Sequence, residues 1–180
     1  MQDEFQYDLK IPKERVAVLI GVDGKIKKEI EEKTKTKINV DSESGEVFIN
    51  GKDGLNIFDA KEVVQAIGRG FNPKIAMNLL KGDYVFEIIN IKDYANSQKA
   101  MLRLKGRVIG EEGKSRRIIE ELTEASISVY GKTVAIIGEP ESCANAKQAI
   151  VSLLEGAPHP SVYRWLEKKR KIKKQEQMLQ

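Results

Sequence analysis

The five-residue stretch Gly21-Val22-Asp23-Gly24-Lys25 returns 89 residues later, from position 21 to position 110, as Gly110-Glu111-Glu112-Gly113-Lys114. An apolar run precedes both stretches. The correspondence continues at the same spacing in the pairs Ile30 and Ile119, Thr34 and Thr123, and Ile38 and Ile127. A period of this length is too long for a solenoid repeat. The sequence therefore predicts two copies of one small domain.

The apolar pattern predicts the order strand-helix-loop-helix-strand-strand-helix in each copy, which is an α+β fold. In the first copy we expect a strand at 5–11, helices at 13–20 and 25–34, strands at 37–40 and 46–50, and a helix at 56–67. In the second we expect a strand at 84–91, helices at 97–108 and 114–124, strands at 127–130 and 133–137, and a helix from Pro140. The predicted domains are 1–70 and 83–156, with a linker helix in 71–82 and a basic C-terminal helix in 157–180.

Composition narrows the class of protein. The 180 residues hold 31 Lys and Arg against 27 Asp and Glu, so the net charge is only +4 and its placement matters more than its size. No signal peptide and no apolar run of membrane-spanning length is visible, which favours a cytoplasmic protein that does not contact membranes. The single cysteine, Cys143, excludes an internal disulfide and is expected to be a buried small residue.

The glycine stretches suggest a phosphate-binding loop. Two glycines spaced as GxxG allow a tight turn and close approach of a ligand, and the following helix directs free N–H groups and its positive dipole end at the loop. Cations open both following helices, although an anion would suit the dipole there. They are Lys25, Lys27 and Lys28 in the first copy and Lys114, Arg116 and Arg117 in the second. We interpret them as serving an anionic ligand, the alternative being structural turns beside a solvated charged face.

This element order around a GxxG loop resembles the type I, eukaryotic-style KH domain, in which a three-stranded antiparallel sheet is covered by helices. The resemblance implies binding of single-stranded RNA, with the loop clamping about four nucleotides. The loop centres are acidic or apolar, but the second copy has extra cations before its loop, so we expect the second domain to be the stronger RNA site. The predicted RNA-binding residues are Gly110, Glu111, Glu112, Gly113, Lys114, Ser115, Arg116, Arg117, Arg103, Lys105, Arg107, Gly21, Val22, Asp23, Gly24, Lys25, Lys27 and Lys28.

A closer resemblance rests on three segments: 66–73 (AIGRGFNP), 104–116 (LKGRVIGEEGKSR) and 159–163 (HPSVY). They are similar to archaeal KH-domain ribosome-assembly factors of the partner-of-Nob-one (Dim-two)/Krr family. The resemblance implies binding near the 3′ end of small-subunit rRNA during ribosome assembly and rRNA processing. It also implies contact with an rRNA-processing endonuclease and a translation initiation factor subunit. Two alternatives stay open: a KH-type regulator of mRNA, and a protein-interaction scaffold whose KH folds do not bind RNA.

The sequence argues against an enzyme. Gly113-Lys114-Ser115 resembles the end of a P-loop, but Val108 occupies the position where that motif requires its first glycine. His159 is the only histidine and lies between two prolines, where we expect a contact of the tail and not a general base. We expect no catalytic residue, no metal and no cofactor.

Overall fold

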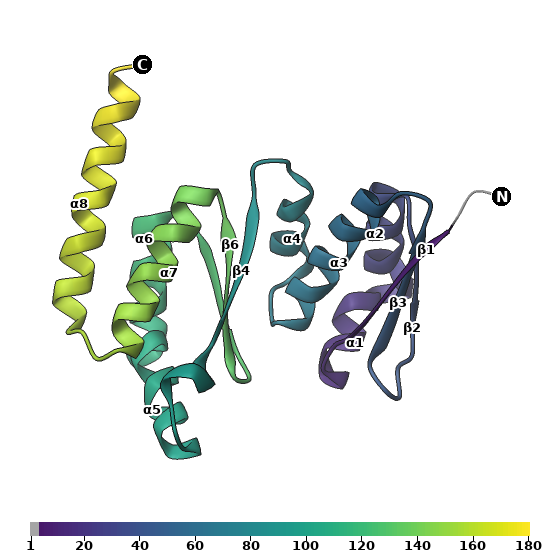
Figure 1. Cartoon of the computed structure of the whole chain (residues 1–180), viewed down its shortest axis with the longest axis horizontal. Coiled ribbons are helices and arrows are strands. Elements are labelled where there is room, and N and C mark those ends of the chain that lie inside the picture. Colours follow the sequence, from purple (N-terminus) through teal and green to yellow (C-terminus); the bar gives the residue numbers. More distant parts are fainter. Residues whose placement is uncertain (1–3) are drawn as a thin grey trace. The chain divides into compact units, whose positions relative to one another are not determined.

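The computed structural model describes residues 4–180. Contacts divide the chain into two compact units, Met1–Tyr84 (the first unit) and Val85–Gln180 (the second unit), and each is described by itself (Figure 1). Among the described residues, no helix combines the length and apolar character needed to cross a bilayer.

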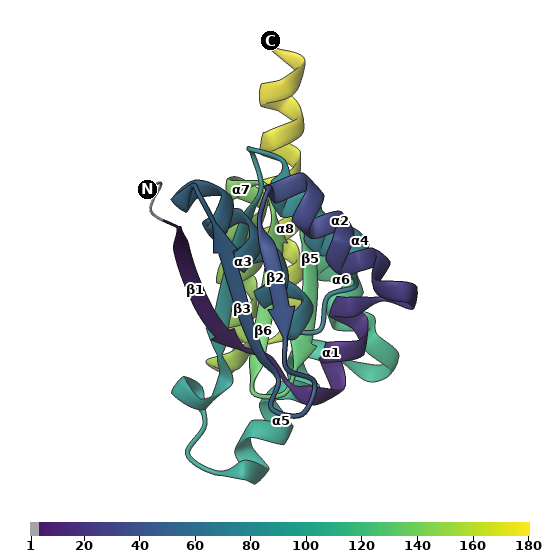
Figure 2. The ribbon, with the colours of Figure 1, turned by 90° about the vertical axis from the view of Figure 1, so that its right-hand side faces the viewer.

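The first unit consists of a three-stranded antiparallel sheet in the order β1-β3-β2, with helices on one face (Figure 2). Val47 and Ile49 of the central strand are fully buried beneath those helices. Burial of an aliphatic side chain of this size stabilises the fold by about 1.5–3 kcal/mol. The elements are β1 (Phe5–Lys10), α1 (Lys13–Ile20), η1 (Val22–Gly24), α2 (Lys25–Thr34), β2 (Lys37–Val40), β3 (Glu46–Gly51), α3 (Gly54–Gly68), α4 (Pro73–Ala76) and η2 (Met77–Leu80).

The second unit repeats this architecture with the sheet order β4-β6-β5. Its core joins Val134 and Ile136 of β6 to Ile119 of α6 and Ile150 of α7, all fully buried. The elements are β4 (Val85–Asn90), η3 (Ile91–Tyr94), α5 (Gln98–Ile109), η4 (Glu111–Gly113), α6 (Lys114–Thr123), β5 (Ser126–Tyr130), β6 (Thr133–Gly138), α7 (Pro140–Leu154) and α8 (His159–Met178).

The two units share unusual backbone positions. The four non-glycine residues with positive φ among those described form two equivalent pairs, Asp23 with Glu112 and Lys35 with Glu124. The first pair lies in the glycine loops and the second ends α2 and α6 in the left-handed conformation. Because left-handed backbone is costly for a side chain, its repetition indicates that both turns are requirements of the fold.

The predicted fold class is confirmed, with two tandem domains of the expected element order. The structure differs from expectation in short segments. The linker helix expected in 71–82 is a single α-turn (α4) followed by the 3-10 helix η2, and the strand expected to reach Ile91 ends at Asn90. There the Asn90 side chain accepts a hydrogen bond from the Lys92 N–H and starts η3.

The predicted linker and tail helices occupy equivalent places in the repeat. α4 follows Gly70 of the first unit as α8 follows Gly156 of the second, and Ala76 and Val162 are buried at matching positions. α4 contacts α3, while α8 contacts α6 and α7, so each helix packs on its own unit. Each unit therefore carries one helix more than the predicted order, short in the first unit and 20 residues long in the second.

Candidate nucleic-acid interface

The GxxG loops, residues 21–24 and 110–113, have nearly the same backbone in both units. The first glycine has φ 73° and ψ 175° at Gly21, and φ 74° and ψ 173° at Gly110. A Cβ atom on Gly110 would lie 2.6 Å from the Ser115 nitrogen, and one on Gly21 would lie 2.5 Å from Ile26 Cγ1. Glycine is therefore required at the first position, where the chain passes close to the start of the next helix.

The helices that follow the loops lack capping side chains. α2 begins after Gly24 and α6 after Gly113, and neither glycine has a side chain that could cap the helix. The first N–H group of each helix donates to a loop carbonyl, that of Val22 or Glu111, and the N–H groups that follow have no side-chain cap. By contrast, Asp53 caps α3 and Ser97 caps α5 through side-chain oxygens. Uncapped N–H groups at a helix start are donors for an anion, and the helix dipole adds to the attraction.

The cations around the second loop fall into two groups. Lys114 and Arg117 are exposed and, among residues 4–180, form no hydrogen bond or ion pair through their side chains. Arg116 is half-buried and donates to Glu120 Oε2 at 2.8 Å. Glu120 Oε1 in turn accepts the Ile127 N–H, at 2.8 Å, on the free edge of β5. Arg116 thus belongs to a chain of contacts that ties α6 to the sheet.

The first unit repeats this division. Lys25 and Lys28 are exposed, and neither forms a side-chain hydrogen bond or ion pair within the described part of the chain. Lys27 lies 3.3 Å from Glu31 Oε1 and donates to the Ile38 carbonyl at 2.8 Å. Glu31 Oε1 accepts the Ile38 N–H at 2.7 Å. The sequence analysis did not predict that Glu31 and Glu120 join the helix to the edge strand. The signal was present, because each glutamate follows a cation of the same helix by four residues.

Two predicted RNA-binding residues, Ser115 and Arg107, have side chains directed into the second unit. Ser115 is 2% exposed, so a ligand cannot reach its side chain in this conformation. The Arg107 guanidinium is directed inward, where it donates to the carbonyl oxygens of Leu153, at 3.0 Å, and Ala157 at the end of α7. In the first unit Arg15 donates to the matching carbonyls, of Ile67 at 2.8 Å and Phe71 at 2.7 Å.

The other predicted site residues lie on the surface around the loops. Arg103 is exposed on α5, and Lys105 is half-buried on the same helix. The loop-centre residues are exposed in both units: Val22, Asp23, Glu111 and Glu112. The carboxylates of Asp23, Glu111 and Glu112 oppose an anion, so attraction must come from the backbone donors and the flanking cations.

The side chains that could bind a metal or act as a nucleophile or base also lie within residues 4–180. No group of histidine, cysteine, aspartate and glutamate side chains there could hold a metal ion. Burial, with a contribution from Glu87, raises the pKa of the Cys143 thiol to about 12, so the group is protonated at neutral pH and a poor nucleophile. His159 Nε2 donates to the Arg107 carbonyl at 2.8 Å, which makes it the tail contact that the sequence indicated.

Comparison with known proteins agrees with this geometry. Residues 85–171 match the eukaryotic-type KH domain (KH-domain type I), and residues 6–66 match the KH domain. The chain is 53% identical to KH domain-containing protein MJ0443 of Methanocaldococcus jannaschii over 178 residues, covering 96% of this chain and 78% of that protein. It is 34% identical over 105 residues to pre-rRNA-processing protein PNO1 of Chaetomium thermophilum, covering 57% of this chain and 40% of the relative.

Among solved structures, the chain is similar to one described as the a/eIF2alpha-aDim2p-rRNA complex from Pyrococcus horikoshii OT3. The TM-score is 0.87 and the identity 51%, over 93% of this chain and 95% of that one. The chain therefore belongs to the archaeal Dim2p/PNO1-like family of tandem KH-domain proteins, an RNA-binding and non-catalytic family.

Proposed function

We propose that this protein binds single-stranded RNA near the 3′ end of small-subunit rRNA during ribosome assembly and rRNA processing. The observation that carries the proposal is the start of α6, where uncapped N–H groups and two exposed cations, Lys114 and Arg117, converge beside a GxxG loop. Backbone donors without a side-chain cap and unpaired positive charge together favour a phosphate. One relative is named a pre-rRNA-processing protein, and another is described in a complex with rRNA. Both descriptions support rRNA as the source of that phosphate.

The second unit should provide most of the affinity. Both units carry two exposed cations without side-chain partners at the start of the post-loop helix, within the residues described. On the helix that precedes the loop, the second unit adds Arg103 and Lys105, whereas the first adds only Lys13 besides the inward-directed Arg15. More cations near one strand mean more phosphates neutralised, and hence a steeper dependence on salt.

Protein partners are also part of the proposal. The related Pyrococcus horikoshii protein is described in a complex with a/eIF2alpha and rRNA, which supports contact of this chain with the equivalent translation initiation factor subunit. Contact with an rRNA-processing endonuclease is proposed from the family resemblance. Pull-down with each purified partner, in the presence and absence of RNA, would test both contacts.

The RNA assay compares two matched double variants, Lys114→Glu with Arg117→Glu and Lys25→Glu with Lys28→Glu. Each pair changes the charge by the same amount at equivalent, exposed positions. Fluorescence anisotropy with an oligonucleotide from the rRNA 3′ end should show a loss of about tenfold or more for the second-unit pair. The slope of log affinity against log salt should fall by about 0.7 for each phosphate contact removed.

Three outcomes would contradict the proposal in different ways. Equal losses from both pairs would overturn the ranking of the units. Equal affinity for an unrelated single strand would favour the mRNA regulator or a non-selective binder. Absence of binding at low salt would favour the protein-interaction scaffold.

A further inference from the structure

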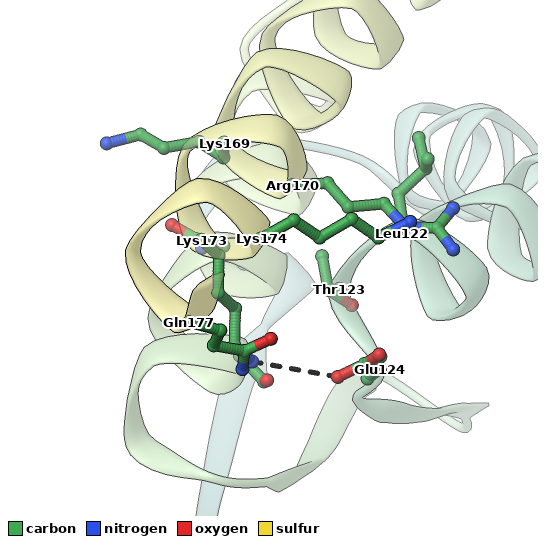
Figure 3. Close-up of a pocket in the computed structure, with 10 residues that line it drawn as sticks. Leu122, Thr123, Glu124, Lys169, Arg170, Lys173, Lys174 and Gln177 are labelled. Carbon is green, nitrogen blue, oxygen red and sulfur yellow. Dashed lines mark ion pairs between the residues drawn. The ribbon is translucent and has the colours of Figure 1, made fainter. Parts of the chain in front are cut away.

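The second unit contains a second cationic site, away from its GxxG loop. It is a pocket of about 80 Å³ between the end of α6, the first turns of α7 and the outer half of α8 (Figure 3). We call it the α8 pocket. Glu124 provides the single carboxylate of its lining. The lining also includes four cations from α8, which are Lys169, Arg170, Lys173 and Lys174.

The face of α8 that packs on the unit changes character along the helix. Val162 and Leu166, one turn apart, are 4% and 1% exposed and anchor the first half of α8. One turn further, the same face presents Arg170 and then Lys174. A helix held only by packing would continue this stripe with apolar residues. The change to cations therefore indicates a role other than packing.

Arg170 provides the strongest sign of a ligand. Its Nε atom is buried and has no hydrogen-bond partner in the described residues. A buried cationic donor without an acceptor is costly, and guanidinium groups fit phosphate oxygens closely. Figure 3 shows Arg170 and Lys174 extending from α8 toward Leu122 of α6, so both cations lie on the same side of the pocket.

The carboxylate in the pocket is already neutralised. Lys173 Nζ lies 3.6 Å from Glu124 Oε2. Glu124 is held beside α8 by the left-handed turn that ends α6. Lys169 lies 5.5 Å from the centre of the Trp165 ring and extends to the other side of α8 in Figure 3. Arg170 and Lys174 are thus the cations that remain for an external anion.

We propose that the α8 pocket binds a backbone phosphate of the RNA, beyond the nucleotides held by the GxxG loop. This rests on the proposed function, because the same strand must occupy both sites. α6 joins them: its first residues carry Lys114 and Arg117, and its last line the pocket. A ten-residue helix is about 15 Å long, so a strand held at the loop must continue along α6 to reach the pocket.

Among the described residues, the first unit has no counterpart of the outer half of α8. It has a pocket between α2 and the α4–η2 segment, lined by Lys33, Lys74 and Lys81. Lys33, however, pairs with Glu29 at 2.8 Å, and Lys81 lies over the Tyr84 ring. The matching segment of the first unit, α4 with η2, ends at Leu80 after eight residues, whereas α8 continues for 20 residues. The cations that line the pocket all lie beyond the length that the first-unit segment reaches. The proposal therefore assigns the gain in affinity from added RNA length to the α8 cations of the second unit.

The test uses the full chain, two RNA lengths and two matched double variants. Arg170→Gln with Lys174→Gln removes the cations of the pocket. Lys168→Gln with Lys171→Gln removes the same charge from exposed positions of the same helix that do not line the pocket. The RNAs contain about four and about twelve nucleotides, the longer being three times the length clamped by one KH loop. Trp165 fluorescence confirms in each variant that α8 stays docked.

We expect the pocket variant to bind the longer RNA about tenfold more weakly, with the short RNA unaffected. Its salt slope on the longer RNA should fall by about 0.7 for one phosphate lost. The control variant should lose much less. Equal losses from both variants would overturn the proposal in favour of diffuse attraction by the tail.

Two further outcomes separate this proposal from the proposed function. If wild-type protein binds both RNAs and the pocket variant binds them equally well, the pocket is not an RNA site. If the pocket variant then loses binding to a poly-glutamate peptide and not to RNA, the pocket is assigned to an acidic protein segment. If the wild type binds neither RNA, the proposed function and this inference both fail. If the wild type binds only the longer RNA and the pocket variant loses that binding, the assignment of the loop fails and the pocket remains an RNA site.

Discussion

Replacing Arg107 by methionine should destabilise the second unit and leave RNA affinity unchanged. The guanidinium donates two hydrogen bonds to carbonyls at the end of α7, those of Leu153 and Ala157. A hydrogen bond from a charged group contributes about 1.5–3 kcal/mol, but these carbonyls lie at a helix end where water can replace part of the loss. We therefore expect a net loss of about 2 kcal/mol, or about 8–16 °C in Tm for a domain of this size.

The sequence provides a local probe for this unfolding. Trp165 is the only tryptophan of the chain and packs against the core of the second unit. Its fluorescence during thermal unfolding therefore reports the second unit, and anisotropy with labelled RNA at a lower temperature reports binding. Methionine keeps the apolar stem of Arg107 in place, so the change in Tm measures the loss of the guanidinium.

Two controls use arginines elsewhere in the chain. Arg15→Met removes the equivalent contacts from the first unit and should leave the Trp165 transition in place. Arg103→Met removes an exposed cation from the same helix as Arg107, so RNA affinity should fall while Tm stays the same. A variant of Arg107 with unchanged Tm and weakened RNA binding would refute the structural role and restore this arginine to the RNA site.

Two other changes test the interior of the second unit. Ser115→Ala should raise stability by about 1 kcal/mol in urea unfolding, because the Ser115 hydroxyl is buried without a hydrogen-bond partner in the described residues and the equivalent position of the first unit is Ile26. RNA affinity should not change, and a loss of stability would reveal an acceptor for this hydroxyl. Cys143 should resist a thiol reagent in the native protein at pH 8 and react once unfolded, since burial raises its pKa to about 12. Because the folded-state pKa is the higher one, the stability from this group is complete below the ordinary thiol pKa and is lost as the pH rises toward 12; Cys143→Ala should flatten that alkaline decline, and an unchanged pH profile would contradict it.

Local patterns were sufficient to predict most elements. α1 and α2 have the bounds expected from the sequence, because glycines or a proline flank them and their apolar residues follow a helical period. η3 was not predicted, since it depends on a single side-chain contact from Asn90. The extra helix of each unit was predicted, as the linker helix and the basic C-terminal helix, but their equivalence was not. It was visible only as Gly70 followed by Pro73 and Gly156 followed by Pro158, a weak similarity that the unequal helix lengths conceal.

The candidate site was predicted less completely. The loops and the exposed cations follow from residue type and position along one helix. The inward direction of Arg107 does not, because its acceptors lie 46 and 50 residues away in the sequence. Burial of Ser115 depends equally on the close approach of Gly110. Long-range packing decides which polar side chains remain available, and a helical charge pattern carries no information about it.

The duplication offers an internal comparison that separates structural roles from functional ones. Arg15 and Arg107 reach matching carbonyls, yet counting from the loops Arg15 lies six residues before Gly21 and Arg107 three before Gly110. The two arginines make the same contact although their distances from the loop differ by about one helical turn. The contact, and not the aligned position in the sequence, identifies their shared role. The inward arginine contact that both units build in this way serves the fold. The features of one unit alone, Arg103 of α5 and the long outer half of α8, are where a function specific to the second unit should be sought.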